Sequence, residues 1–84
     1  MMKKKELKLG TVVKSMAGHD AGRFYIIIKL SKDRAYIADG KLRKLEKPKA
    51  KNVAHLSSTN KIINLSNCET NKSLREFLSN FNSV

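Results

Sequence analysis

The sequence predicts a mainly β fold, a small SH3-like barrel of about five strands followed by a C-terminal α-helix. Three observations carry this prediction. Short runs rich in β-branched residues are separated by turn-forming residues, as in small barrels. One of these runs, residues 24–30, alternates at the period of a strand. Near the C terminus the spacing of the apolar residues changes to that of a helix.

The first two strands are expected on either side of a polar loop. Residues 11–15 are rich in valine and favour a strand. The loop 17–23 follows, and its glycines, Gly18 and Gly22, supply the positive φ angles that a tight connection requires. In strand 24–30 the face we expect to form the core consists of Phe24, Ile26, Ile28 and Leu30. The opposite face is half apolar and needs partial cover.

The dipeptide Asp39-Gly40 predicts a hairpin. It follows the short strand 35–38, and Asp-Gly is a strong two-residue turn signal between strands. Counting outward from this turn places Ile37 opposite Leu42, with both side chains pointing inward. The basic segment 41–51 then becomes the second arm of the hairpin.

The end of the chain contains one more strand and a helix. Residues 52–56 alternate and form a fifth short strand. Ser73 and Glu76 have the spacing of a capping box in which the serine is the N-cap. Because Leu74, Phe77, Leu78 and Phe81 follow at helical spacing, we expect a helix over residues 73–82. It covers the second face of strand 24–30 or one mouth of the barrel.

These elements divide the 84 residues into three parts. A basic N-terminal arm spans residues 1–8, the barrel spans residues 9–58, and a connection with the C-terminal helix spans residues 59–84. A chain of this length buries roughly 60% of its unfolded surface, which leaves little volume for an enclosed active site.

Positive charge is concentrated in the predicted arm and barrel. The chain carries 18 Lys and Arg against 7 Asp and Glu, for a net charge of +11. Residues 1–55 hold 15 of the basic and 5 of the acidic side chains. An excess of one sign confined to one region is typical of a surface that binds phosphate, which we favour over the alternative that the lysines serve only solubility.

The residue patterns of enzymes and metal sites are not apparent. There is no Ser/His/Asp or Cys/His arrangement and no phosphate-binding loop sequence. The single cysteine, Cys68, and the histidines His19 and His55 lack metal-ligand spacing. The basic start is not followed by the apolar segment of a secretory signal, and the longest apolar run is too short to span a bilayer. We therefore expect a cytoplasmic protein that is not an enzyme and has no cofactor, metal or membrane attachment.

Three consecutive segments carry a resemblance to known proteins: Gly10-Thr11-Val12-Val13, then Ala17-Gly18-His19-Asp20-Ala21-Gly22-Arg23, then Phe24 to Ile28. Together they resemble the KOW motif, which ribosomal proteins share with the transcription factor NusG. With the stretch Asp39-Gly40-Lys41-Leu42-Arg43-Lys44, the span from Gly10 to Leu56 is similar to the bacterial KOW-domain RNA-binding proteins. Those are related to the large-subunit ribosomal protein of the fourteenth eukaryotic type. The bacterial proteins also have a tail similar to Asn71-Lys72-Ser73-Leu74-Arg75.

This resemblance implies an SH3-like barrel that binds structured RNA without a cofactor. The partner it implies is ribosomal RNA or the large ribosomal subunit. His19 departs from the family, because relatives often carry arginine there, and the change lowers the positive charge at the loop tip. We expect basic side chains to contact phosphates, which positions RNA without reading its sequence. The candidate RNA-binding residues are Lys14, His19, Arg23, Lys41, Arg43, Lys44, Lys47, Lys49 and Lys51.

Two other functions are compatible with the sequence. A protein-interaction module of a transcription or translation complex would use the barrel edge and the C-terminal helix. A membrane-surface module is less favoured, because the amphipathic helix carries little positive charge and the basic residues lie on predicted strands and loops.

Overall fold

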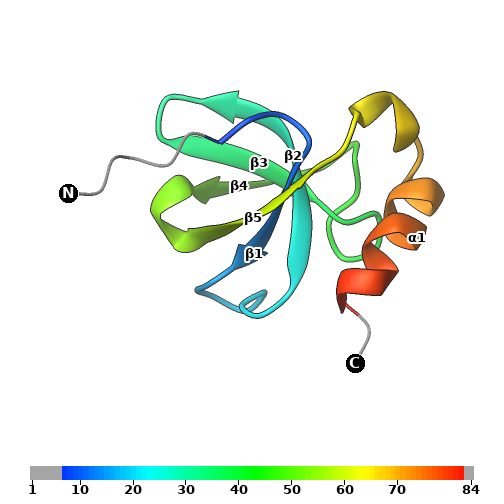
Figure 1. The fold of residues 1–84 in the computed structure, drawn as a ribbon. Helices are drawn as coiled ribbons and strands as arrows, with labels where there is room; N and C mark the ends of the chain where they lie inside the picture. Colours follow the sequence, from blue (N-terminus) through cyan, green and yellow to red (C-terminus); the bar gives the residue numbers. More distant parts are fainter. Residues whose placement is uncertain (1–6, 83–84) are drawn as a thin grey trace.

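The structure is a computed structural model that describes residues 7–82. It contains a five-stranded antiparallel sheet curled into a half-barrel, with one α-helix packed against it (Figure 1). The strands and helix are β1 (Thr11–Ser15), β2 (Phe24–Ser31), β3 (Arg34–Ala38), β4 (Lys49–Asn52), β5 (Leu56–Ile62) and α1 (Asn71–Asn82). Short 3-10 helices span Val53–His55 and Leu65–Asn67. The prediction of a small, mainly β barrel with a C-terminal helix is confirmed.

Two parts of the predicted organisation fall partly outside this description. Residues 1–6 of the predicted basic arm and residues 83–84 at the chain end lie outside the described residues. The two remaining residues of the arm are already part of the folded domain. Leu7 packs against the barrel core, and Lys8 closes a turn in which its carbonyl oxygen accepts a hydrogen bond from the Thr11 hydroxyl at 2.7 Å.

The strand order in the sheet is β4-β3-β2-β1-β5. The central strand is therefore β2, and β4 and β5 are the edge strands of the sheet. The β1–β2 connection is the predicted loop, and Gly18 and Gly22 have φ angles of +86° and +90° as expected. The predicted fifth strand over residues 52–56 is wrong. Those residues contain the end of β4, the 3-10 turn Val53–His55 and the first residue of β5.

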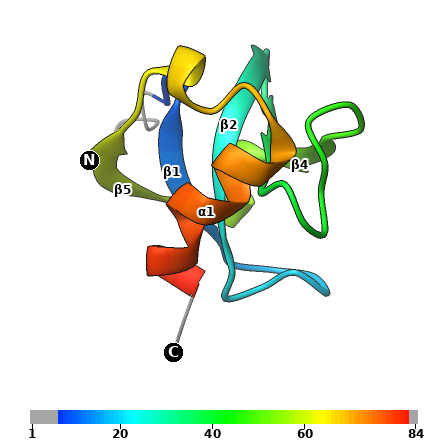
Figure 2. The same ribbon diagram turned by 90° about the vertical axis from the view of Figure 1, so that its right-hand side faces the viewer.

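Both faces of β2 are buried. Tyr25 and Ile27 point into the barrel, where they pack with Val13, Ala35, Ile37 and Leu56. Ile26, with Phe24 and Ile28, belongs to a second cluster on the other face, which includes Leu74 and Leu78 of α1. Figure 2 shows α1 lying in front of β1 and β2. The face of Phe24, Ile26 and Ile28 lies in a core as expected, but Leu30 is 37% exposed, and α1 covers this face and not the opposite one. Alternation identifies two faces of a strand, but where both are apolar it does not identify which one lies inside the curl.

The predicted hairpin at Asp39-Gly40 is wrong. β3 pairs instead with β4, in a register that places Ile37 opposite Lys49, and the residues between the two strands form a long loop. Leu42, expected to point inward, is 58% exposed. The turn signal is overridden by tertiary contacts of Asp39 and Gly40, which are described below. We call residues 39–48 the basic loop.

The helix begins earlier than predicted. α1 starts at Asn71, and Thr70 occupies the capping position. The backbone N–H of Ser73 donates to the Thr70 hydroxyl at 3.0 Å, and the backbone N–H of Thr70 donates to the Ser73 hydroxyl at 3.2 Å. Ser73 is therefore the third residue of the helix and not its N-cap. The reciprocal pattern of a capping box is met by Thr70 and Ser73, three residues before the predicted pair.

Gly40 connects the basic loop to α1 and is open to a direct test. Its φ is +79°, and a Cβ at this position would meet the carbonyl oxygen of Asn71 in α1. We expect Gly40→Ala to destabilise the domain by about 2–5 kcal/mol, because left-handed strain of about 1–2 kcal/mol adds to overpacking of about 1–3 kcal/mol. Urea unfolding followed by circular dichroism measures the loss.

The matched control for this substitution is Gly22→Ala. Gly22 has a φ of +90°, but no atom lies within 4 Å of the added Cβ. Gly22→Ala should therefore cost only the backbone strain. Equal losses in the two variants would show that Gly40 does not support the packing of the loop on the helix.

Candidate nucleic-acid interface

The loop between β1 and β2 is held by a buried aspartate. Asp20 is 6% exposed, and its Oδ1 accepts hydrogen bonds from the Ser15 hydroxyl at 3.1 Å and from the Lys51 ammonium at 3.0 Å. Burial raises the pKa of Asp20, but the hydrogen bonds from Lys51 and Ser15 and the charge of Lys51 outweigh it, so the pKa lies below its ordinary value of 3.8. The carboxylate is therefore ionised at neutral pH.

Lys51 takes part in this structural contact and is not available at the surface. Its residue is 8% exposed, and its ammonium also donates to the carbonyl oxygen of Ala17 at 2.8 Å. The interpretation of Lys51 as a phosphate ligand is corrected for this reason. The ammonium group of Lys51 instead holds the β1–β2 loop against β4.

Asp39 organises the start of the basic loop. Its Oδ1 accepts hydrogen bonds from the backbone N–H groups of Lys41 at 2.9 Å and Arg43 at 2.8 Å. Its Oδ2 forms an ion pair with the Arg23 guanidinium at 3.5 Å. The backbone N–H groups of Asp39 and Gly40 both donate to the carbonyl oxygen of Arg43. This compact turn folds residues 39–43 back on themselves, which directs the chain away from a hairpin.

The first turns of α1 clamp the same loop. The side-chain oxygen of Asn71 accepts a hydrogen bond from the backbone N–H of Leu45 at 2.7 Å, and its amide nitrogen donates to Glu46 at 2.8 Å. The hydrogen bond from Asn71 is the main reason that the pKa of Glu46 is lowered. Arg75 donates to the carbonyl oxygen of Gly40 at 3.3 Å. The helix therefore fixes the path of the loop at its start and in its second half.

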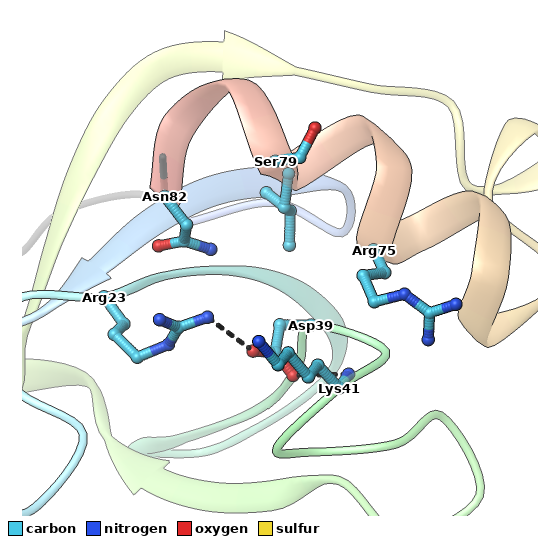
Figure 3. Close-up of a pocket in the computed structure, with 7 residues that line it drawn as sticks. Arg23, Asp39, Lys41, Arg75, Ser79 and Asn82 are labelled. Atoms are coloured by element: carbon cyan, nitrogen blue, oxygen red, sulfur yellow. Dashed lines mark hydrogen bonds and ion pairs between the residues drawn. The ribbon is translucent and has the colours of Figure 1, made fainter. Parts of the chain in front are cut away.

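These contacts gather basic side chains at one end of the barrel. Arg23 at the end of the β1–β2 loop, Lys41 from the basic loop and Arg75 from α1 line a pocket of about 220 Å³ between loop and helix (Figure 3). Along the loop, Lys41, Lys44 and Lys47 are exposed. Arg43 and Lys49 are half-buried. We call this set the basic cluster: Arg23, Lys41, Arg43, Lys44, Lys47, Lys49 and Arg75.

Arg75 is the member of the basic cluster that sequence reasoning missed. It belongs to the segment similar to the tail of the bacterial KOW-domain proteins, but nothing in its spacing predicted that it would face the basic loop. The approach of α1 to Gly40 brings it there.

The other predicted site residues lie apart or at the margin. Lys14, on β1, is half-buried and places its ammonium 5.7 Å from the centre of the Phe24 ring. It therefore packs on an aromatic side chain and does not line the pocket between loop and helix. His19 is exposed on the β1–β2 loop and lines a small pocket together with Arg43. The β1–β2 loop and the basic loop thus come together at His19 and Arg43.

Within residues 7–82, no group of three or more His, Cys, Asp and Glu side chains could hold a metal ion. In the same range, no helix has the length and apolar character needed to cross a membrane. Cys68 is buried under α1, and this burial raises the pKa of its thiol. A raised pKa disfavours the reactive thiolate.

Comparison with protein-family models gives no match for this chain, and comparison with curated proteins gives none either.

The buried ion pair can be tested by Lys51→Met. The substitution keeps most of the side-chain volume but leaves the Asp20 carboxylate buried without its cation. We expect a loss of about 3 kcal/mol in unfolding free energy, at the low end of the range for breaking a buried pair. Lys49→Met, on the same strand and without such a pair, should change stability by no more than about 0.5 kcal/mol. The unfolding free energy of both variants is measured in urea. Equal losses in the two variants would contradict the structural role of Lys51.

Acid unfolding gives a second test of the same contact. Because the pKa of Asp20 is lowered in the folded state, its contribution to stability is present above the pKa of the unfolded chain. It is lost as the pH falls from about 4 through the lower pKa of the folded state. In Lys51→Met this part of the acid dependence should disappear, since burial then opposes ionisation. Unfolding free energy measured as a function of pH in both proteins checks the sign.

Proposed function

We propose that this protein is a non-catalytic RNA-binding protein that recognises structured RNA through the basic cluster. The observation that carries the proposal is the convergence of these cations from the β1–β2 loop, the basic loop, β4 and α1 at one end of the barrel. Glu46 is the one exposed carboxylate of the basic loop, while the Asp39 carboxylate is buried against Arg23 and backbone N–H groups. Such a surface attracts the phosphate backbone of a nucleic acid.

The arrangement favours phosphate contacts over stacking on an aromatic surface. Phe81 contacts both Phe24 and Phe77, and all three rings pack against the core between α1 and the sheet. Tyr25 is fully buried, and Tyr36 is half-buried with the ammonium of Lys29 5.3 Å from its ring centre. A sheet that binds single-stranded RNA presents exposed aromatic rings on which the bases stack. In this protein the aromatic rings pack against other side chains. Recognition by backbone and shape is therefore the proposed mode.

The RNA we propose is ribosomal. This part of the proposal rests on the resemblance to KOW-domain proteins, and it places the protein in the cytoplasm, with the ribosome or its large subunit. Crosslinking of the tagged protein in cells with sequencing of the bound RNA, alongside a sedimentation profile, tests it. Crosslinks at one ribosomal RNA site and co-migration with large subunits support the proposal. Scattered crosslinks and migration free of ribosomes contradict a ribosomal role.

The alternative of a protein-interaction module that uses the helix receives less support. The apolar side of α1 packs against the sheet, where Leu74 and Leu78 are buried and Phe77 and Phe81 pack against the same cluster. Its exposed residues are mostly polar or charged, among them Lys72, Arg75, Glu76 and Asn80. A helix docked in this way offers no apolar stripe for a partner.

The phosphate contacts can be tested by Lys44→Gln/Lys47→Gln. Both lysines are exposed, so the fold should be unaffected. Affinity for a labelled RNA hairpin, measured by fluorescence anisotropy between about 50 and 200 mM salt, should fall. The slope of log affinity against log salt should become shallower by about 0.7–0.9 for each contact removed.

Lys32→Gln/Lys61→Gln is the matched control for this experiment. It removes the same charge from exposed lysines in the β2–β3 turn and near the end of β5, at the opposite ends of the strands from the basic loop. If the two double variants weaken binding equally, the RNA is attracted by net charge alone, and the proposed location of the interface is wrong.

A further inference from the structure

The pocket between the basic loop and α1 gathers three cations from separate parts of the chain around one space. Its volume is about 220 Å³, and it is lined by Arg23, Asp39, Lys41, Arg75, Leu78, Ser79 and Asn82. Sites for whole small molecules begin at about 300 Å³, so this space suits a small group and not an entire nucleotide. In the view of Figure 3, Arg23 and Arg75 lie on two sides of Asp39 and Lys41.

Positive charge dominates the lining of this pocket. Among the residues that line it, three cations face one carboxylate, that of Asp39, which leaves a net charge of +2. The side chain of Asp39 is 1% exposed. It already accepts hydrogen bonds from two backbone N–H groups and pairs with Arg23. An anion that enters the pocket therefore meets the cations more directly than it meets this carboxylate.

The three cations keep hydrogen-bonding capacity for a ligand. Arg23 lies 3.5 Å from Asp39, and Arg75 lies 3.3 Å from the carbonyl oxygen of Gly40. Charge-assisted hydrogen bonds are usually about 2.7–2.9 Å long, so both contacts are long. Each guanidinium carries several N–H donors, and even without the buried Nε of Arg23 both retain donors for a further acceptor. Within residues 7–82, no ion pair involves the ammonium of Lys41.

The walls of the pocket are fixed by contacts that do not depend on a ligand. The side chain of Asn82 accepts a hydrogen bond from the backbone N–H of Phe24 at 2.8 Å and donates to its carbonyl oxygen at 3.1 Å. This ties the end of α1 to the start of β2. Arg75 ties an earlier turn of the helix to Gly40, and Leu78 between the two contacts is buried. A site formed in advance loses less conformational entropy when it binds.

We propose that this pocket holds one phosphate group of a bound RNA strand, an inference that rests on the RNA-binding function proposed above. The guanidinium groups of Arg23 and Arg75 and the ammonium of Lys41 donate to its oxygens. A planar guanidinium presents paired N–H groups that match two oxygens of one phosphate, a match that a spherical chloride ion does not offer. The exposed lysines of the basic loop attract any anion, whereas this pocket selects a phosphate.

Inorganic phosphate is the first probe, because it tests the pocket without RNA. The protein is titrated at neutral pH with sodium phosphate, and separately with sodium chloride at the same ionic strength, while its 1H–15N NMR spectrum is recorded. We expect phosphate, and not chloride, to shift the signals of Arg23, Gly40, Lys41 and Arg75 until they saturate. Arg75→Gln should weaken phosphate binding about ten-fold or more, the low end for a hydrogen bond to a charged group.

Lys72→Gln is the matched control for Arg75→Gln. It removes the same charge from an exposed residue of the same helix that does not line the pocket, so it should bind phosphate as the unmodified protein does. Lys41→Gln is a second variant that removes a ligand of the phosphate. Its side chain is exposed and forms no ion pair within residues 7–82, so the fold is not at risk. Thermal melts of all three variants check this.

Arg75→Lys connects the pocket to RNA, because it keeps the charge and loses the planar group. Affinity for a labelled RNA hairpin is measured by fluorescence anisotropy over a series of salt concentrations. The substitution should lower the affinity at every salt concentration and leave the slope of log affinity against log salt unchanged, since that slope counts charges.

Failure of the pocket and failure of RNA binding give different results. Equal effects of phosphate and chloride, or equal phosphate binding by Arg75→Gln and Lys72→Gln, overturn the pocket while RNA binding by the basic loop stands. Full RNA affinity in Arg75→Lys overturns the placement of an RNA phosphate in it. If the unmodified protein binds phosphate but no RNA hairpin at low salt, the proposed function is wrong, and the phosphate does not come from RNA.

Discussion

The burial of both faces of β2 is the constraint from which most of this structure follows. From Phe24 to Ile28 every residue is aliphatic or aromatic, so neither face of the strand is compatible with water. The curl of the sheet encloses one face, and α1 has to cover the other. To do so, the helix crosses the sheet and brings its first turns against the loop that follows β3. A requirement of the core thus positions the basic loop.

Two buried aspartates complete this arrangement in a chain of strongly positive charge. Asp20 and Asp39 lie beneath the two loops, and each is paired with a cation, Lys51 or Arg23. A buried pair of this kind contributes little net stability compared with an apolar contact, but its geometry is specific. The ion pair with Asp20 withdraws Lys51 from the surface, whereas Arg23, with a side chain that is 33% exposed, still lines the pocket between loop and helix. Both pairs fix the loops to which they belong. Loops that are ordered before binding pay less conformational entropy when a ligand arrives.

The sequence predicted what depends on neighbouring residues and missed what depends on contacts across the fold. Strand 24–30, the two loop glycines and the C-terminal helix follow from local periodicity and backbone chemistry. The prediction of a hairpin at Asp39-Gly40 was wrong because a helix distant in the sequence packs on these residues. The burial of Lys51 could not be predicted, because its partner Asp20 is 31 residues away in the sequence. Arg75 joins the basic cluster through the same helix packing, so most of the site's charge was predicted but not its assembly.

The proposed RNA binding and the order of the two loops depend on charges in different surroundings. Attraction between the exposed lysines of the basic cluster and phosphates would weaken as salt increases, because counterions compete for the same charges. The ion pairs of Asp20 with Lys51 and of Asp39 with Arg23 are buried or partly buried, so salt screens them much less. Raising the salt concentration should therefore weaken the proposed binding while the loops that carry the basic cluster keep their conformation.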